Sequence, residues 1–287
     1  IRHALATNTL VALVNGHGET LGWINETLQP RAGRHLAQAR LALDEAARLD
    51  LARILVEGRL RNQRAVLRRL LAERKKSGRS RPQKALDAIV TISRLLGRGE
   101  RSRIRHARAI DVLTGYEGQA GAAWWRAIGA LVHPDFSFAV RRENSAAGIA
   151  LDFLAWLLHR DISVAVMRAG LHPGFGALHA VSDQRDACVY DLMEEFRAQF
   201  VGGLFVHASN ARILRRDMFS GSGKGIRMKS AGGTALIRAY ERRAEGLVKS
   251  PRGGRRVRWR MLMMEQAQAL SAHVEGGGHY QPYEMSY

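Results

Sequence analysis

The sequence is poor in cysteine and in acidic residues. Its single cysteine, Cys188, excludes a disulfide within the chain and suits a reducing compartment. We expect Cys188 to be a small buried residue, because no His and acid accompany it in the local sequence. Only 26 Asp and Glu stand against 45 Lys and Arg, which gives a formal net charge of +19, and Arg far outnumbers Lys. This imbalance predicts a polyanionic partner, because guanidinium groups bind phosphates bidentately and release counterions.

Long apolar runs are also absent. No stretch is long enough to span a bilayer, and none has the pattern of a basic amphipathic helix at a membrane surface. Nucleic acid is therefore a better candidate for the polyanion than a membrane. The 287 residues can bury a sizeable core in one or two domains. The first residues do not show the pattern of a signal peptide, and because the sequence begins at Ile1 without Met we expect it to start inside a fold, as the remainder of a longer polypeptide.

The first 30 residues have the pattern of a β-hairpin. Two apolar, β-branched stretches, TLVALV and TLGWI, flank the sequence NGHGE. Asn15 and Gly16 adopt positive φ readily, as a hairpin turn requires. Because two strands cannot bury a face alone, we interpret residues 1–30 as the C-terminal remnant of an N-terminal β domain.

From about residue 31 onward, apolar residues recur with the spacing of α-helices, and residues 31–287 are predicted to form one large α-helical domain. One or two long helices are expected before the breaker SGRSRPQ at 77–83, and Pro82 is expected in the first turn of the next helix. A further helix is expected from about Arg103 to Leu113. The predicted fold class is therefore α+β, mainly α.

Basic residues form three clusters along the chain. They comprise Arg59, Arg61, Arg64, Arg68 and Arg69; Arg101, Arg103, Arg105 and Arg108; and Arg252, Arg255, Arg256, Arg258 and Arg260. One cluster is typical of a solvated helix face, but three with no balancing acids favour a surface that binds phosphates. The candidate DNA-binding residues are Arg59, Arg61, Arg64, Arg252, Arg255 and Arg256.

An acidic helix is predicted at SDQRDACVYDLMEEFRAQF, residues 182–200. At about 100° per residue, Leu192 and Phe196 share one side of it, while Asp191 and Glu194 lie together on the other. Carboxylates in such a position are usually solvated. The pattern alone therefore predicts that these acids are surface residues.

A second acid lies among small residues in GYEGQAGAAWW. Glu117 is at helical spacing from Ala120 and Gly121, and small side chains on the same face let a substrate or another backbone approach closely. Taken alone, however, an acid in this position is typical of a helix surface or a capping partner.

A Gly- and Pro-rich turn, AGLHPGFGALHA at 169–180, carries two histidines. We interpret His172 as a polar loop residue and expect His179 at the start of the next helix. Glu117, His179 and Glu194 would together form an oxygen and nitrogen set suited to Mn²⁺ or Mg²⁺ and not to structural zinc. Their spacing alone does not group them, because they lie far apart in the sequence.

Six stretches in this order resemble the CRISPR adaptation integrase family, the universal Cas endonuclease/integrase that inserts new spacers into a CRISPR array. Four carry the match, namely YEGQAGAAWW, GLHPGFGALH, YDLMEEFR and YQPYEM, and two support it, namely ILVEGRLRNQRAVLRR and MKSAGGTALIRAYERR. The resemblance covers nearly the whole chain. The resemblance implies a small N-terminal β domain and a larger α-helical domain.

The resemblance also implies roles for individual residues. It places the metal ligands of the family on Glu117, His179 and Glu194, with Mg²⁺ or Mn²⁺ as cofactor, and it gives Asp191 a supporting catalytic role. We expect Asp191 to orient a ligand or a metal-bound water by a hydrogen bond. Arg197 also matches, and we expect it to form a structural or substrate-orienting ion pair.

The chain departs from the family at three positions. Gly148 and Ala155 stand where many members have Asn and Tyr, and Gly202 stands where an Asp is often found. Substrate contacts made by those side chains are therefore in doubt. The expected ligands are intact, so we expect activity to survive.

The implied reaction is the insertion of double-stranded spacer DNA into a CRISPR repeat by transesterification, in the cytoplasm of a prokaryote. The resemblance implies a homodimer, a small ferredoxin-like second integrase subunit and, in some members, an upstream fusion to a reverse transcriptase or a nuclease. Two alternatives remain: a metal-dependent nuclease that cleaves branched DNA, and a basic helical scaffold that binds nucleic acid without chemistry. Intact ligands argue against the scaffold, and strand-transfer products would separate the two enzymes.

Overall fold

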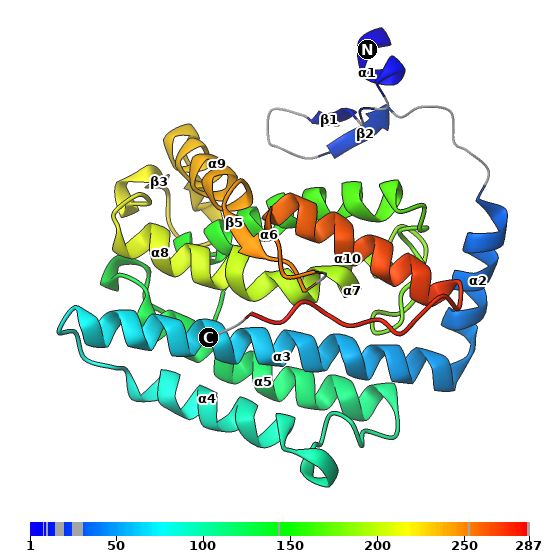
Figure 1. Cartoon of the computed structure of the whole chain (residues 1–287). Coiled ribbons are helices and arrows are strands. Elements are labelled where there is room, and N and C mark those ends of the chain that lie inside the picture. Colours follow the sequence, from blue (N-terminus) through cyan, green and yellow to red (C-terminus); the bar gives the residue numbers. More distant parts are fainter. Residues whose placement is uncertain are drawn as a thin grey trace.

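Helices dominate the structure, a computed structural model that describes residues 1–7, 9, 11–14, 20–24, 31–142, 144–251 and 253–285. Within this part of the chain, the strands form three short two-stranded antiparallel sheets (Figure 1). The mainly α fold class is thereby confirmed.

The N-terminal segment contains α1 (Arg2–Ala6) and a hairpin of β1 (Val11–Val14) and β2 (Thr20–Ile24). The strands are antiparallel, with Val11 opposite Ile24. This confirms the predicted hairpin, whereas its expected turn residues Asn15 and Gly16 lie outside the described residues. In Figure 1 the hairpin lies at the edge of the helical body, and Leu21, Gly22 and Trp23 of β2 line a cavity together with residues of that body. The boundary at residue 30 stays a prediction.

Two helices follow, α2 (Ala32–Leu43) and α3 (Glu45–Lys76). Asp44 separates them: its backbone is extended, and its Oδ1 accepts hydrogen bonds from the amides of Ala46 and Ala47 at 3.0 Å. This N-cap satisfies two donors that the first turn of α3 would otherwise leave free. The long α3 then supplies much of the core with its buried Leu, Val and Ala side chains.

Next come α4 (Gln83–Leu96) and α5 (Ile110–Leu131), which pack against α3 (Figure 1). Pro82 is the N-cap of α4, one position before the expected first turn. The helix expected from about Arg103 is wrong, because the residues before Ile110 form turns.

Packing against α3 explains why these residues do not extend α5. Ile104 is fully buried, and the carbonyl of Ala107 accepts hydrogen bonds from Arg53 of α3, one of them from Nε at 2.9 Å. A carbonyl held by a distant side chain does not need a partner four residues further on.

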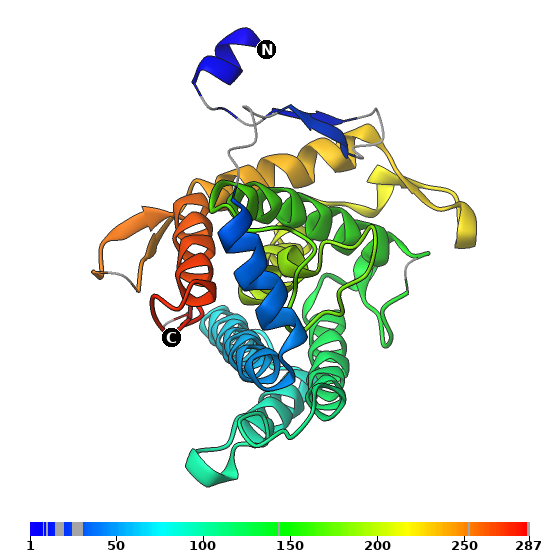
Figure 2. The same cartoon turned by 90° about the vertical axis from the view of Figure 1, so that its right-hand side faces the viewer.

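The second half contains the remaining elements. They are α6 (Ala146–Arg168), α7 (Ala187–Arg197), a π-helical turn (Ala198–Gly203), α8 (Leu204–Asn210), α9 (Ser230–Ala244) and α10 (Trp259–Val274), with the strand pairs β3 (Phe219–Ser220) and β4 (Arg227–Met228), and β5 (Leu247–Lys249) and β6 (Arg256–Arg258). Helix α7 packs against both α3 and α6 and lies inside the helical body (Figures 1 and 2).

The π-helical turn after α7 explains one departure from the family. A Cβ added at Gly202 would lie 2.5 Å from Cζ2 of Trp124, so the indole of α5 occupies the place of any side chain. An Asp does not fit here without moving Trp124. Gly202 thus allows close packing between α5 and the turn.

The C-terminal tail lies along α3 (Figure 1). Asn62 of α3 donates from Nδ2 to the carbonyl of Tyr283 at 2.7 Å and accepts from the amide of Met285 at 2.7 Å. The tail also requires a glycine at position 58 of α3, because a Cβ added to Gly58 would lie 2.6 Å from the ring of Pro282. The tail motif YQPYEM therefore belongs to the core of the helical body.

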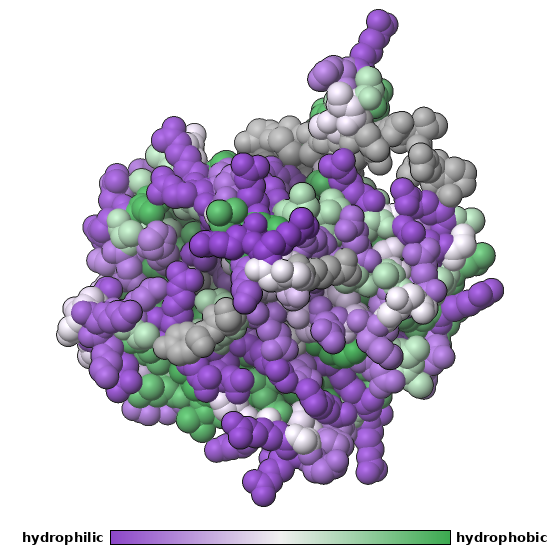
Figure 3. All heavy atoms as spheres, in the orientation of Figure 1, coloured by the Kyte–Doolittle hydropathy of each residue, from purple (hydrophilic) through white to green (hydrophobic). Residues whose placement is uncertain are grey.

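Hydrophilic residues cover most of the face seen in Figure 3. Among the residues that the structure describes, no helix is both long and apolar enough to cross a membrane.

Candidate active site

The acids of α7 are buried. Asp191, Glu194 and Glu195 are 2%, 1% and 0% exposed. The prediction from periodicity, that Asp191 and Glu194 lie on a solvated face, is therefore wrong. Its physical reason is the position of α7, which is covered on its polar side by α3 and by the loop that precedes it. Buried carboxylates must be compensated by partners.

Arg59 of α3 connects the two glutamates. Its Nη1 donates to Oε1 of Glu117 on α5 and forms an ion pair at 2.8 Å with Oε2 of Glu194 on α7, an oxygen that has no hydrogen-bond partner among the described residues. Glu194 also accepts from Nη1 of Arg197 through Oε1 at 3.1 Å, the ion pair expected of Arg197. Burial raises the pKa of Glu194, but the charges of Arg59, Arg197 and His179 outweigh it, so the pKa is lowered and the carboxylate is ionised.

Asp191 folds the preceding loop onto α7. Its two oxygens accept the amides of Ala177, Leu178 and His179 at 2.5, 3.1 and 3.0 Å, and Oδ1 lies 2.7 Å from Nδ1 of His179. The expected position of His179 at the start of a helix is wrong. It lies in the loop, because these backbone donors bind a carboxylate in the middle of α7 and not the end of a helix.

The hydrogen bond from Asp191 determines the state of the His179 ring. Burial lowers the pKa of His179, but the hydrogen bond and charge of Asp191, followed by the charges of Glu194 and Glu117, raise it overall. Because Nδ1 is bound to Asp191, Nε2 is the nitrogen left to bind a ligand. Asp191 thus makes the kind of hydrogen bond that we expected, while its role beside a metal stays a prediction.

The chemistry of these side chains fits a hard divalent cation. The carboxylates of Glu117 and Glu194, from different helices, are close enough to share one cationic group, the guanidinium of Arg59. The negative charges of both also raise the pKa of His179. Mg²⁺ and Mn²⁺ prefer such oxygen-rich sets. However, within the described ranges no three His, Cys, Asp or Glu residues form a compact group that could hold a metal ion. A metal here requires Arg59 to release the carboxylates, and the ligand set stays a prediction.

The candidate DNA-binding arginines do not lie on one open surface. Arg59 is only 8% exposed, Arg61 is paired with Glu57 and Glu284, and Arg255 is paired with Glu265 at 2.7 Å. The expectation that the basic clusters lack balancing acids is wrong. Glu57 lies one helical turn from Arg61, and Glu265 and Glu284 are brought to their arginines by the fold. Of the remaining candidates, Arg256 is exposed on β6, Arg64 is half-buried, and Arg252 lies outside the described residues.

Two residues of the site were not predicted from the sequence. Arg59 was assigned to the DNA surface, and no local signal marks it as the bridge between Glu117 and Glu194. Glu195 was noted only as part of the YDLMEEFR motif. No local signal marks its burial, because adjacent residues in a helix lie about 100° apart and can both face solvent.

Glu195 connects α7 with the C-terminal tail. Its Oε2 accepts from the amide of Tyr283 at 2.7 Å and from Nε2 of Gln266 at 2.8 Å, while Oε1 has no hydrogen-bond partner among the residues that the structure describes. Burial raises the pKa of Glu195 to about 8, and the bonds from Tyr283 and Gln266 oppose this only in part. Glu195 is therefore mainly a neutral acid at pH 7.

The raised pKa of Glu195 predicts that the free energy of unfolding depends on pH. The carboxyl of Glu195 has a pKa of 4.5 in the unfolded chain and about 8 in the folded protein, so the neutral form stabilises the fold below pH 4.5. That stabilisation, up to about 5 kcal/mol, is lost as the pH rises towards about 8. Glu195→Gln should flatten the free energy of unfolding over this window in denaturant titrations. An unchanged slope in the variant would show that Glu195 is ionised when folded.

Comparison with known proteins supports the resemblance seen in the sequence. The family model of CRISPR associated protein Cas1 matches residues 1–242. The CRISPR-associated endonuclease Cas1 3 of Thermus thermophilus is 26% identical over 289 residues, which cover 99% of this chain and 81% of that protein.

Solved structures share the fold. A casposase bound to its integration product matches with a TM-score of 0.81 at 18% identity, covering 99% of this chain and 77% of that chain. A chain of the Cas6-RT-Cas1–Cas2 complex matches with a TM-score of 0.78 at 18% identity, covering all of this chain and 31% of that one. From the family match over most of its length, we conclude that the chain belongs to the CRISPR associated protein Cas1 family.

Proposed function

We propose that the chain is a CRISPR adaptation integrase and endonuclease that inserts spacer DNA into a CRISPR array with the help of Mg²⁺ or Mn²⁺. The observation that carries this proposal is the pairing of Glu117 and Glu194, from two different helices, with the one guanidinium of Arg59. The charges of both glutamates raise the pKa of His179, whose ring is held by Asp191. The family and the names of its relatives, which are called endonucleases, support it.

The proposed reaction is a transesterification. The 3′-hydroxyl of the spacer attacks a phosphate at the repeat boundary, one P–O bond forms as another breaks, and the proton lost by the hydroxyl is balanced by one gained at the leaving 3′-oxygen. Glu117, Glu194 and Nε2 of His179 would hold the metal, which supplies charge stabilisation to the phosphate.

The remaining side chains organise this centre. Asp191 keeps Nδ1 of His179 bound, so that the ring presents Nε2 in one orientation. Arg59 and Arg197 place positive charge beside the carboxylates, and a guanidinium displaced from Glu117 and Glu194 is positioned to bind a phosphate oxygen instead. Burial of Glu194 keeps these interactions strong by excluding water.

The proposed partners are duplex spacer DNA and repeat DNA, a second copy of the chain, and a small second integrase subunit. The solved Cas6-RT-Cas1–Cas2 complex, in which a Cas1 relative is assembled with Cas2, supports such a subunit and also a fusion to an upstream reverse transcriptase. Both remain proposals for this chain.

One experiment tests the proposed function. The protein is incubated with Mn²⁺, a short duplex and a supercoiled plasmid that carries a repeat, with a chelator as control, and the junctions are sequenced. We expect metal-dependent joining of the duplex to the plasmid at repeat boundaries. Cleavage without joining would favour the nuclease on branched DNA, and binding without any new ends would favour the scaffold.

A further inference from the structure

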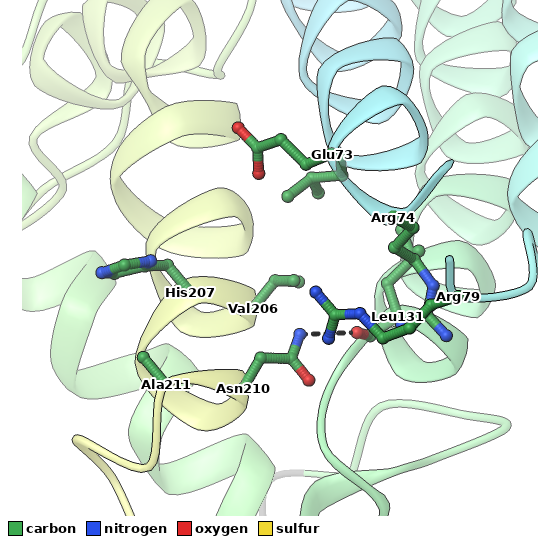
Figure 4. Close-up of a pocket in the computed structure, with 9 residues that line it drawn as sticks. Glu73, Arg74, Arg79, Leu131, Val206, His207, Asn210 and Ala211 are labelled. Atoms are coloured by element: carbon green, nitrogen blue, oxygen red, sulfur yellow. Dashed lines mark hydrogen bonds between the residues drawn. The ribbon is translucent and has the colours of Figure 1, made fainter. Parts of the chain in front are cut away.

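A cavity of about 230 Å³ lies at the C-terminal end of α3, remote from the candidate active site. Its walls come from α3, from the end of α5 and from α8, and include Arg74, Arg79, Leu131, Val206, His207 and Asn210. Figure 4 shows the two arginines opposite the α8 residues, with Asn210 bound to the carbonyl of Leu131 at 2.9 Å. We call this cavity the distal pocket.

The two arginines of the distal pocket are fixed but not neutralised. Nε of Arg74 donates to the carbonyl of Ser80 at 2.8 Å, and Nε of Arg79 donates to Oγ of Ser77 at 3.0 Å. In the part of the chain that the structure describes, neither guanidinium forms an ion pair with a carboxylate. A guanidinium held by Nε with its terminal amino groups free is pre-organised for bidentate binding of an oxyanion.

The surroundings of the pocket are strongly positive. Its one acid, Glu73, is already paired with Arg69 at 2.9 Å. Burial and then the charge of Arg79 lower the pKa of Arg74, and burial followed by the charge of Arg243 lowers the pKa of His207. Like charges are therefore crowded here, and a bound anion would relieve their repulsion.

A simpler role would be stabilisation of the C-terminus of α3, since basic residues in the last turn interact favourably with the helix dipole. That role accounts for Arg74, which lies in the last turn. It does not account for Arg79, which follows the helix in the loop and lines the same cavity. The described lining residues include no Phe, Tyr or Trp that could stack on a base, and His207 carries their one aromatic ring. The two guanidinium groups therefore favour a phosphate as ligand.

The distal pocket and the candidate active site lie at two points along α3, along α5 and along the continuous segment from α7 to α8. Arg74 follows Arg59 by 15 residues on α3, and Leu131 follows Glu117 by 14 on α5. His207 follows Glu194 by 13 residues through α7, the π-helical turn and α8. At about 1.5 Å per helical residue the two sites are roughly 20 Å apart, which is about six base pairs of B-DNA at its rise of about 3.4 Å.

We propose that the distal pocket binds a phosphate of the duplex DNA backbone about six base pairs from the reacting phosphate. The proposal rests on the proposed function, because it identifies the phosphate source as the DNA that is joined. Arg74 and Arg79 supply the bidentate contacts, and the contact positions the duplex without reading its sequence.

The test measures affinity for branched duplexes whose arm beyond the junction is shorter or longer than about six base pairs. The wild type should bind the longer arm more tightly and with a steeper salt dependence. In Arg74→Gln/Arg79→Gln the gain from the longer arm should disappear, and the slope of log affinity against log salt should be shallower by about 1 to 2. Fluorescence anisotropy provides the affinity, and circular dichroism checks the fold.

A matched control removes the same charge elsewhere. Arg40 on α2 and Arg238 on α9 are both exposed, and α2 lies at the opposite end of α3 in Figure 1. Arg40→Gln/Arg238→Gln should keep the gain from the longer arm. If the control variant and the test variant both lost that gain, the loss of affinity would be explained by net charge alone, and the proposal would be overturned.

Two outcomes separate this proposal from the proposed function. If the protein joins no DNA but the gain from the longer arm still depends on Arg74 and Arg79, the integrase function fails and the distal pocket stands. If joining proceeds and the double variant keeps the full gain, the pocket proposal is overturned. It is also overturned if the pocket binds only inorganic phosphate, seen as a shift of the His207 ring signals by NMR, while duplex binding is unaffected.

Discussion

Glu117→Ala, His179→Ala and Glu194→Gln are each expected to lower strand transfer by more than about 100-fold. The reason is that the proposed centre takes one donor from each residue, so that each substitution leaves only two of the three proposed ligands. Gln is chosen at Glu194 because it preserves volume at a site that is 1% exposed, and it can still accept from Arg197. Rates are measured as joined plasmid per unit time.

The control for these variants is Glu265→Gln on α10. Glu265 is also buried and paired with an arginine, Arg255, but it lies outside the proposed centre. It should retain wild-type strand transfer. All variants should keep their fold and their affinity for duplex DNA. Joining at the wild-type rate by His179→Ala would show that the proposed ligand set is wrong.

Asp191→Asn is expected to lower strand transfer by about 10- to 100-fold and to lower the free energy of unfolding by roughly 1–3 kcal/mol. The carboxylate accepts four N–H groups from the loop that carries His179. An amide offers one oxygen, so its NH₂ group must face donors that then lose their acceptor. Both the loop and the orientation of the His179 ring are disturbed.

Metal rescue separates the roles of Asp191 and Glu194. Raising the Mn²⁺ concentration should partly restore Asp191→Asn, because its proposed ligands are intact, and should not restore Glu194→Gln. Thermal unfolding measured in parallel accounts for any fraction of Asp191→Asn that is unfolded at the assay temperature. The opposite pattern, with Glu194→Gln rescued and Asp191→Asn inactive, would mean that the two acids have exchanged roles.

Local sequence patterns predicted which helices and strands form better than they predicted what those elements pack against. The hairpin and the long helices were predictable from turn residues and from 3.6-residue periodicity, since both depend on neighbours in the sequence. The turns before Ile110 were not, because they are stabilised by Arg53 from a helix more than 50 residues away. Tertiary contacts overrode local propensity there.

The sequence did not reveal the burial of Asp191 and Glu194, because that burial also depends on tertiary contacts. Periodicity places Asp191 and Glu194 opposite the apolar side of α7 and cannot tell whether that side meets water or other elements. Their partners, Arg59 and the 177–179 loop, come from distant parts of the chain. Resemblance to a family grouped Glu117, His179 and Glu194, whereas the bridging position of Arg59 emerged only from the structure.

The central claim is that Glu117, His179 and Glu194 bind one divalent metal. It is tested most directly by electron spin echo envelope modulation of Mn²⁺ bound to the whole protein, which detects a directly coordinated nitrogen. The wild type should show coupling to one imidazole nitrogen, and this coupling should vanish in His179→Ala and persist in a variant of the loop residue His172. Bound Mn²⁺ without nitrogen coupling, or coupling that survives in His179→Ala, would contradict the account.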